Sequence, residues 1–312
     1  MRPGRLADRL KRRLAACGAA MAAWACAAAP LQAQAARHAT QVDPAGAAPA
    51  FAQRAPVPRH AARAIALAPH ITELIHAAGA GERIVATVLS SDYPPEALAI
   101  PRIGDGIHVN VEQALALRPD LIVAWLPHGA AQVMAPAASR LGIPLIYSRP
   151  GKLADIPSEI VRFGRLFGTE AHANETARAL TRRLEALGEH YARRKPVSVF
   201  IEVGASPLYT IGNDPLLNDA LRLCGGVNLY ADAAMAAPQV ILEDLLARRP
   251  DVVIVAPAGA DERDALLRWT GLKLPAALRG HVHALDPDAL FRPGPRLIDA
   301  AEQLCRHLDD AR

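Results

Sequence analysis

The fold is indicated by a stretch of sequence that occurs twice, EQALALRPDLIV at residues 112–123 and EDLLARRPDVVI at residues 243–254. Each copy starts with an apolar-periodic segment typical of a short helix, and the proline of the following Arg-Pro-Asp ends that helix. The aliphatic run after the aspartate predicts a buried strand. Because the two copies stand 131 residues apart, we predict two related α/β lobes.

Strands alternate with helices around both copies, which favours parallel α/β layering in each lobe. In the first lobe we predict strands at residues 64–67, 84–88, 121–125 and 145–147, and helices opening at Thr72, after Asn110 and at Ala130. In the second lobe we predict strands at residues 198–203, 252–256 and 282–285, and helices at residues 216–223, at residues 265–269 and from Arg296 onward. Ligands of such sheets bind at the carboxyl ends of the strands, here in a crevice between the lobes.

Residues 154–194 separate the lobes and are typical of helix, with an interruption at Gly168-Thr169. Alanine and leucine recur at helical spacing in the second part of this segment. About two dozen helical residues span roughly 36 Å, the diameter of a small domain. We therefore predict an α/β protein in which one long rigid helix joins two Rossmann-like lobes, residues 63–153 and residues 195–312.

The formal net charge of +4 comes from the amino terminus, because residues 1–35 hold six basic residues and one acidic residue. An uncharged apolar stretch follows at residues 14–31, and then small residues around Ala35. A basic region, an apolar region and a small-residue site in this order are typical of a secretory signal peptide. We predict export and cleavage near Ala35.

Two alternatives to a cleaved leader remain open, an uncleaved membrane anchor and a lipid attached at Cys17 or Cys26. After the leader, residues 36–62 are rich in alanine and proline, which predicts a flexible tether. The remaining chain is nearly neutral, so its charge gives no argument for a nucleic-acid partner. With 51% hydrophobic and 21% charged residues, the chain is neither wholly disordered nor a polytopic membrane protein.

Two cysteines, Cys224 and Cys305, lie outside the predicted leader. In an exported chain an isolated pair favours a disulfide, and two buried thiols are the alternative. Closing so long a loop stabilises a fold by roughly 4 kcal/mol in the chain-entropy model. The spacing excludes a redox or zinc site of the C-x-x-C type.

Catalytic motifs are absent from the sequence: there is no G-x-S-x-G, no H-E-x-x-H and no phosphate-binding G-x-x-x-x-G-K-[ST]. Gly79-Ala80-Gly81 follows a predicted helix, which indicates a helix C-cap and turn. His70 with Glu73 is a weak metal-ligand pair; the alternative is a loop histidine followed by a helix start. Single candidates for axial coordination of a bound metal complex are His108, His128, His281 and His283. We predict no resident metal and no enzyme, with a secreted enzyme on a similar fold as a remote alternative.

Aromatic residues make up only 4% of the chain, and three of them stand at strand ends facing the predicted crevice. Tyr93 lies in the proline-stiffened loop SSDYPPE, Trp125 ends a predicted strand, and Tyr209 follows the first strand of the second lobe. Flat amphipathic rings at such places favour a ligand platform, and core filling is the alternative.

Four segments resemble the periplasmic cobalamin-binding proteins: IALAPHITEL at residues 65–74, SDYPP at residues 91–95, ALRPDLIVAW at residues 116–125 and LCGGVN at residues 223–228. These proteins belong to the wider family of substrate-binding proteins for iron–siderophore, haem and cobalamin importers. The resemblance runs from about Arg63 to the C-terminus. It implies the helical-backbone periplasmic binding protein fold, a periplasmic location, and cobalamin as a transported ligand with no cofactor.

The resemblance also implies ligand contacts. Tyr93, Trp125 and Tyr209 fall where these proteins pack aromatic rings around the corrin, and Phe291 and Arg292 lie in a loop that borders the same cleft. Together these five side chains form the expected binding site.

The chain departs from the family pattern at several of the expected rings. Ala237 stands where a tryptophan is frequent, and the loop at residues 287–296 lacks another. Since each lost ring removes apolar contact area, a cobamide variant, haem or a ferric siderophore is the alternative ligand. Arg149 and Arg292 would suit the anionic groups of such a ligand.

By the same resemblance, Glu112 and Glu243 dock onto arginines of the membrane permease dimer, and Cys224 and Cys305 fall on a disulfide. The repeat supports the docking role, because it places one carboxylate on each lobe for a two-fold partner. Ordinary solvated glutamates at helix starts are the alternative. We expect a monomer that pairs with an ABC transporter.

Overall fold

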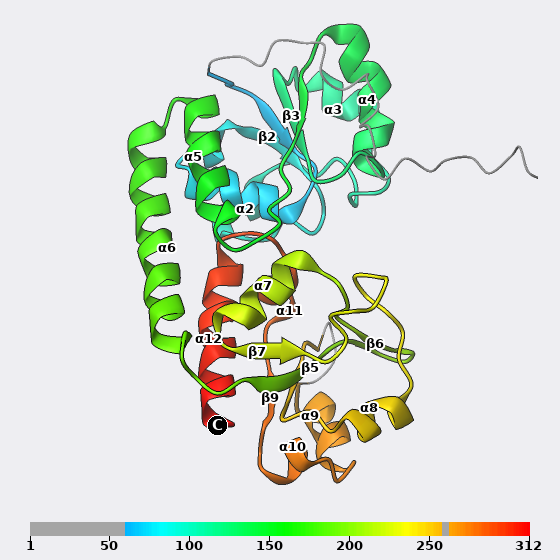
Figure 1. The fold of residues 1–312 in the computed structure, drawn as a ribbon. Helices are drawn as coiled ribbons and strands as arrows, with labels where there is room; N and C mark the ends of the chain where they lie inside the picture. Colours follow the sequence, from blue (N-terminus) through cyan, green and yellow to red (C-terminus); the bar gives the residue numbers. More distant parts are fainter. Residues whose placement is uncertain (1–59, 258–261) are drawn as a thin grey trace, which may run out of the picture. The chain divides into compact units, whose positions relative to one another are not determined.

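The computed structural model describes residues 60–257 and 262–312 (Figure 1). All of them lie in one unit of the chain, Ala48–Arg312. The predicted signal peptide and nearly all of the predicted tether lie outside the described residues. Within the described part, no helix is both long enough and apolar enough to cross a membrane.

The first lobe is built on a parallel sheet of strand order β2-β1-β3-β4. Its strands are β1 (Ala64–Ala66), β2 (Ile84–Thr87), β3 (Leu121–Ala124) and β4 (Leu145–Tyr147). Its helices are α2 (Pro69–Ala77), α3 (Val111–Ala116) and α4 (Ala130–Leu141), with short 3₁₀ turns η1 (Gly81–Arg83) and η2 (Pro95–Ala99). The strand order reverses between β1 and β3, which makes the carboxyl ends of these two strands the expected place for a ligand.

The second lobe is built on β5 (Val197–Ala205), which pairs with β6 (Leu208–Thr210), β7 (Gly226–Asn228) and β8 (Val252–Val255), while β9 (Val282–Ala284) extends the sheet beyond β8. Among these strands of the described residues, β6 alone runs antiparallel to its neighbour. The helices are α7 (Pro215–Leu223), α8 (Leu242–Arg248), α9 (Glu262–Thr270), α10 (Pro275–Leu278), α11 (Pro287–Phe291) and α12 (Arg296–Asp310). The sequence patterning did not predict β6, β7, α10 and α11, which are short elements without an aliphatic run of the kind that marks β1 and β4.

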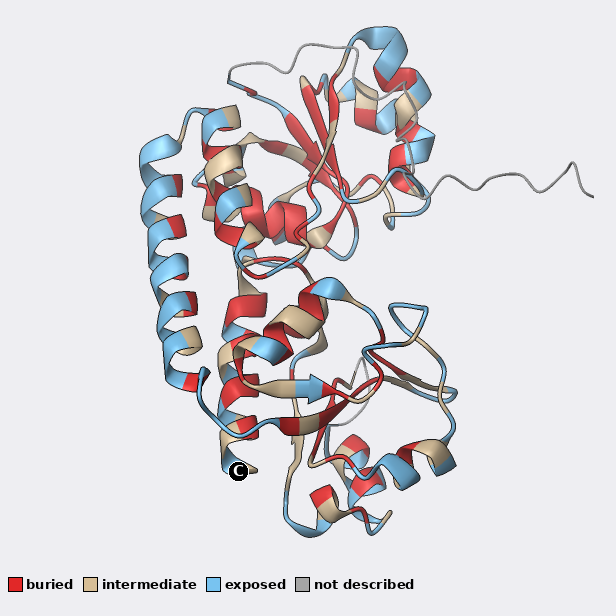
Figure 2. Ribbon diagram, viewed as in Figure 1, coloured by how far each residue is buried: buried red, intermediate tan, exposed pale blue. Residues whose placement is uncertain are grey.

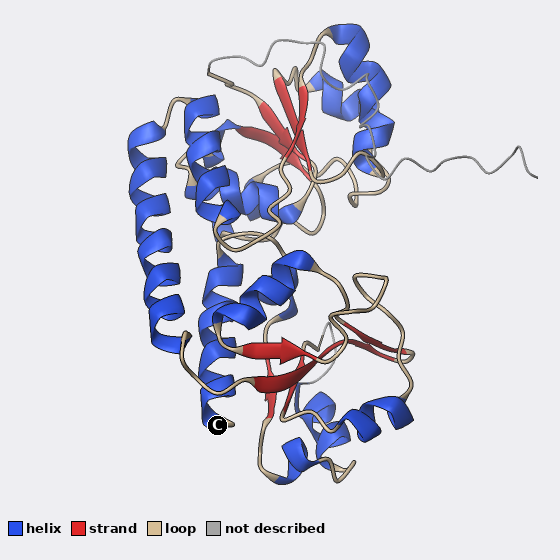
Figure 3. Cartoon of the chain, viewed as in Figure 1, coloured by secondary structure: helices blue, strands red, loops and turns tan. Residues whose placement is uncertain are grey.

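Helices cover both faces of each sheet (Figure 3), because successive strand residues point to opposite sides. In β1, for example, Ile65 packs towards α3 and α4, whereas Ala66 packs towards α2 and α5 (Asp155–Phe167). Each lobe therefore has the α/β layering that the sequence predicts.

The duplicated stretch adopts the same local structure in both lobes. Arg118 and Arg249 both have left-handed backbone, with φ of 49° and 50°. Asp120 accepts hydrogen bonds from the two backbone N–H groups immediately before β1, at 2.8 and 2.9 Å. In the second lobe, Asp251 accepts one from the backbone N–H of Ser198 in β5 at 2.9 Å. In both lobes the aspartate of the repeat therefore fixes the start of the neighbouring strand.

The connection between the lobes consists of α5 and α6 (Glu170–Tyr191). The two helices separate at the predicted interruption, where Gly168 has φ +74°, a conformation that favours glycine. The 22 residues of α6 correspond to about 33 Å. Helix α6 packs on α7 and α12 of the second lobe and on α5, which in turn packs on α2 of the first lobe.

The largest hydrophobic cluster among the described residues includes residues of both lobes, and Figure 2 shows buried segments in each of them. It includes Ile71 and Leu74 of α2, Phe163 of α5, and Leu297 and Ile298 of α12, all buried. Separating the lobes would expose this apolar surface to water, so the core opposes wide hinge opening.

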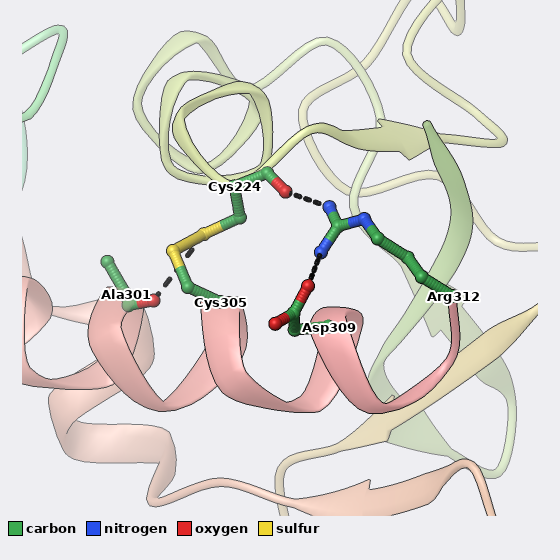
Figure 4. Close-up of a disulfide and its surroundings, with 5 residues drawn as sticks. All are labelled: Cys224, Ala301, Cys305, Asp309 and Arg312. Atoms are coloured by element: carbon green, nitrogen blue, oxygen red, sulfur yellow. Dashed lines mark hydrogen bonds and ion pairs between the residues drawn. A yellow bond between two sulfur atoms is a disulfide. The ribbon is translucent and has the colours of Figure 1, made fainter. Parts of the chain in front are cut away.

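The predicted disulfide between Cys224 and Cys305 is confirmed (Figure 4). It joins the end of α7 to α12, and both cysteines are buried. Arg312 reinforces the link, because its guanidinium donates to the Cys224 carbonyl and to Asp309. The C-terminal helix is therefore held to the second lobe by covalent and polar contacts at one place.

Candidate ligand-binding site

Trp125 stands at the carboxyl end of β3, at the reversal of strand order, and is 42% exposed. Its ring makes an edge contact with His70, with ring centroids 5.3 Å apart. His70 Nε2 lies 3.4 Å from the carbonyl oxygen of Ser148, and burial lowers the pKa of His70 to about 4. A neutral, buried histidine thus supports one side of a half-exposed indole.

A cavity of ≈ 180 Å³ opens beside this indole. It is lined by Leu67, Ile107, Trp125, His128 and the first residues of α4. Its volume is below the few hundred Å³ typical of a whole ligand site. The cavity is therefore suited to one edge of a larger ligand.

Tyr93 lies between β2 and η2 and is 43% exposed. The guanidinium of Arg296, the first residue of α12, lies 4.3 Å from the centroid of its ring. Such a cation–π contact holds an aromatic ring by its face. The first lobe thus presents two exposed rings, Tyr93 supported by the guanidinium of Arg296 and Trp125 supported by the neutral imidazole of His70.

Arg292, an expected ligand contact, is engaged in ion pairs. Its guanidinium lies 2.5 Å from Asp92 and 2.6 Å from Asp288, and the side chain is 12% exposed. Although partial burial opposes it, the hydrogen bond from Arg292 lowers the pKa of Asp92. Phe291, expected beside it, packs partly buried against the hydrophobic core. Phe291 and Arg292 would therefore contact a ligand from side-chain positions that these contacts within the protein already fix.

The structure corrects the expected start of the first helix. Helix α2 begins at Pro69, whose fixed φ suits a first helical position, and not at Thr72. His70 consequently lies in the helix and not in a loop. Thr72 and Glu73 are buried, and the Thr72 hydroxyl bonds to the hydroxyl of Thr87 at 2.8 Å. Neither serves a solvated first turn as expected.

Glu73 makes an ion pair that the sequence analysis missed. Its carboxylate accepts hydrogen bonds from Arg296 Nη2 at 2.7 Å and Nε at 3.2 Å. Burial raises the pKa of Glu73, and Arg296 opposes that shift. The two residues are 223 positions apart in the chain, so no local sequence signal could have paired them.

Tyr209, the third expected ring, lies on β6, a strand that the sequence did not predict. It is half-buried, faces Gly204 of β5 and forms an isolated bridge with Gln239. Among the described residues, no ring contact joins Tyr209 to Tyr93 or Trp125. The first two rings are thus placed on one lobe, and Tyr209 on the other.

Glu112 and Glu243 are each the second residue of a short helix, α3 and α8, and both are exposed. Asn110 caps α3 as predicted, since its side chain accepts a hydrogen bond from the backbone N–H of Gln113 at 3.0 Å. Within residues 60–257 and 262–312, neither glutamate makes a hydrogen bond or ion pair with another side chain. Both carboxylates are therefore available to a partner.

Three of the four histidines considered for axial coordination lie beside other groups, whereas Nδ1 of His281 is buried without a hydrogen-bond partner in the described structure. His108 pairs with Asp105 at 3.1 Å, and His283 of β9 stacks on His307 of α12 with ring centroids 4.0 Å apart. His128 lines the cavity beside Trp125. In the described part of the chain, no three histidine, cysteine or acidic side chains are grouped to hold a metal ion.

Two α/β lobes with a buried interface, a helical connection and exposed rings at strand ends define a two-lobe solute-binding protein. The sequence profile of the periplasmic binding protein family matches residues 65–289, and the chain belongs to this family. It is 34% identical over 251 residues to the vitamin B12-binding protein of Vibrio cholerae serotype O1, covering 80% of this chain and 90% of that protein. The vitamin B12-binding protein of Yersinia pestis is 35% identical over 248 residues, covering 80% of this chain and 86% of that protein.

Solved structures agree with this assignment of the fold. The crystal structure of the periplasmic vitamin B12-binding protein BtuF of Vibrio cholerae superposes with a TM-score of 0.73 at 34% identity, covering 81% of this chain and 99% of that one. The periplasmic heme-binding protein RhuT from Roseiflexus sp. RS-1, in its apo form, gives a TM-score of 0.69 at 25% identity, covering 80% and 99%. The predicted two-lobed binding-protein fold is confirmed.

Proposed function

We propose that this chain is the periplasmic binding protein of an ABC importer and captures cobalamin for delivery to the permease. The observation that carries the proposal is its similarity, over 80% of its length, to curated vitamin B12-binding proteins. The protein would bind its cargo without changing it. Cobalamin is here a transported ligand and no cofactor.

The ligand site of this proposal is the cleft bordered by the exposed rings of the first lobe. Tyr93 and Trp125 offer flat apolar faces, which suit the broad face of a corrinoid. Tyr209, Phe291 and Arg292 would border the ligand from the second lobe. The cavity beside Trp125 would take a peripheral group of the ligand.

The state of Arg292 favours cobalamin over haem as the ligand. Haem carries two carboxylates that suit free cations; of the two arginines expected to suit an anionic ligand, Arg292 is already paired with Asp92 and Asp288, whereas Arg149 is exposed. Haem remains the second candidate because a heme-binding protein shares the fold at 25% identity. An Arg292 that is already ion-paired suits a ligand with little net charge better than it suits an anionic ligand.

Delivery would use the exposed glutamates of the two lobes. Glu112 and Glu243 would each meet a basic residue of one permease subunit, so the monomeric binding protein would orient on a two-subunit partner. For this role the chain would be exported, with its leader removed near Ala35.

The visible absorption spectrum of the protein purified from its native periplasm tests the proposed ligand. We expect the spectrum of a corrinoid, lost when Tyr93→Ala is purified in the same way and retained in Tyr147→Ala, a matched change at the end of β4. An intense Soret band in its place would assign the protein to haem and overturn the cobalamin proposal.

A further inference from the structure

We propose that Arg296 and Glu73 are positioning residues of the ligand cleft: their ion pair crosses from one lobe to the other and sets the orientation of the Tyr93 ring. The proposal rests on the proposed function, because it assumes that Tyr93 contacts the ligand. Neither residue is one of the expected ligand contacts.

The ion pair is almost completely removed from water. The side chain of Glu73, on α2 of the first lobe, is 2% exposed, and that of Arg296, on α12 of the second lobe, is 15% exposed. Two hydrogen bonds, at 2.7 and 3.2 Å, give the pair a fork geometry. A carboxylate that is buried this deeply requires its partner, since an unpaired buried charge is strongly unfavourable.

Gly294 allows the second lobe to approach this carboxylate. A Cβ atom added at Gly294 would lie 3.0 Å from Oε2 of Glu73 and 3.6 Å from its Cβ. A side chain here would therefore press against Glu73. The loop before α12 is thus shaped to bring Arg296 onto a residue of the other lobe.

The same guanidinium also holds Tyr93. It lies 4.3 Å from the centroid of that ring, while the side chain of Tyr93 makes no hydrogen bond within the described residues. The neighbouring Asp92 is tied to Arg292 at 2.5 Å, which anchors the backbone of the same loop. Arg296 is consequently the cationic contact that restrains the ring itself.

Through these contacts the Glu73–Arg296 ion pair influences ligand affinity, although neither residue contacts the ligand. Glu73 fixes the guanidinium of Arg296, and the guanidinium fixes the ring face of Tyr93. A lysine at position 296 would keep the charge near Glu73, but it has no planar fork to bond the carboxylate twice and lie over the ring. The conservative change should therefore separate the positioning role from simple charge.

A double-mutant cycle between Arg296→Lys and Tyr93→Ala tests the proposal, with cyanocobalamin affinity measured by calorimetry. Arg296→Lys should weaken binding roughly tenfold, the size of one such contact. In the Tyr93→Ala background the same change should have little effect. Additive losses, or unchanged affinity in Arg296→Lys, would overturn the proposal.

Arg183→Lys is the matched control. Arg183 also joins α12 to another helix, since it pairs with Asp299 and Glu302 at 2.5 and 2.7 Å, but it makes no cation–π contact in the described structure. The Arg183→Lys variant should leave the affinity for cyanocobalamin unchanged. If Arg296→Lys does not fold, Glu73→Gln replaces it in the cycle, because it leaves Arg296 in place and removes the charge that fixes it.

A readout without ligand distinguishes failure of this proposal from failure of the proposed function. The ring signals of Tyr93, assigned with Tyr93→Phe in a tyrosine-labelled protein, should shift in Arg296→Lys and stay in place in Arg183→Lys. If the wild-type protein binds no cobalamin, the proposed function fails, and this spectrum alone decides the positioning role. Unshifted Tyr93 signals in Arg296→Lys would refute it.

Discussion

Glu112 and Glu243 occupy the same position of two duplicated helices, one in each lobe, and both side chains are exposed. We predict that reversing both charges, Glu112→Lys with Glu243→Lys, reduces cobalamin uptake at least tenfold, because each lost contact becomes a like-charge repulsion against a basic partner. Uptake by cells that carry the cognate permease measures this effect. Cobalamin affinity of the purified double variant should equal that of the wild type.

A control with the same charge change is available on α6, where Glu175 and Glu189 are exposed. Glu175→Lys with Glu189→Lys should leave uptake intact. Equal uptake in the two double variants would show that the repeated glutamates have no docking role.

Trp125 directly follows the carboxyl end of β3, and its ring is in edge contact with His70. We predict that Trp125→Ala weakens cyanocobalamin binding roughly thirtyfold, since it removes a large apolar face worth about 2 kcal/mol. Trp125→Phe should recover part of the affinity. Calorimetric titration measures both, and an unchanged dissociation constant in Trp125→Ala would remove this residue from the site.

Acid should destabilise the protein through histidines that fold in the neutral form. Burial lowers the pKa of His70 to about 4, and burial together with His307 lowers that of His283 to about 4. Because the unfolded chain takes up these protons near the ordinary value of 6.5, stability is lost as the pH falls from about 6.5 to about 4. For His70 the loss is about 3 kcal/mol, and for the more exposed His283 about 1 kcal/mol after allowing for solvent screening.

Urea unfolding between pH 7 and pH 4 measures these contributions by comparison of variants. His283→Gln should flatten the decline in the free energy of unfolding, and His70→Asn should flatten it more. The variants must be compared with the wild type because Glu73 also titrates. Its raised pKa makes the folded protein more stable as the pH falls, which opposes the effect of the histidines. Parallel curves for wild type and both variants would contradict the prediction.

The disulfide should contribute substantially to stability. Its cysteines are 81 positions apart, a loop whose closure corresponds to about 4 kcal/mol in the chain-entropy model. Cys224→Ser with Cys305→Ser should lower the free energy of unfolding by about this amount, measured in urea at pH 7. Treating the wild type with a reductant should lower its free energy of unfolding by a similar amount. The same treatment should not affect the double variant.

Regular features of the fold could be predicted from the sequence because their signals are local. The repeat predicted two lobes, Gly168 the interruption of the connecting helices, and Asn110 a helix cap. The interruption and the cap each depend on residues within a few positions of one another, and each copy of the repeat is itself a local pattern. The order of strands and helices follows from such signals.

The candidate site could be predicted only in part, because its geometry depends on distant pairs. The exposed rings of Tyr93 and Trp125 are signalled by their position at strand ends. The engagement of Arg292 with Asp92, 200 positions away, and of Arg296 with Glu73 is set by how the lobes pack. Short strands such as β6 also escape detection, so the sequence did not show that Tyr209 lies on a strand paired with β5.

Calorimetric titration of the mature chain with cyanocobalamin tests the central claim most directly. We predict saturable binding of one cobalamin per chain with a dissociation constant below about 1 μM, equivalent to a binding free energy of at least about 8 kcal/mol. Haem titrated under the same conditions should bind more weakly. No heat with cyanocobalamin, together with saturable binding of haem, would contradict the account.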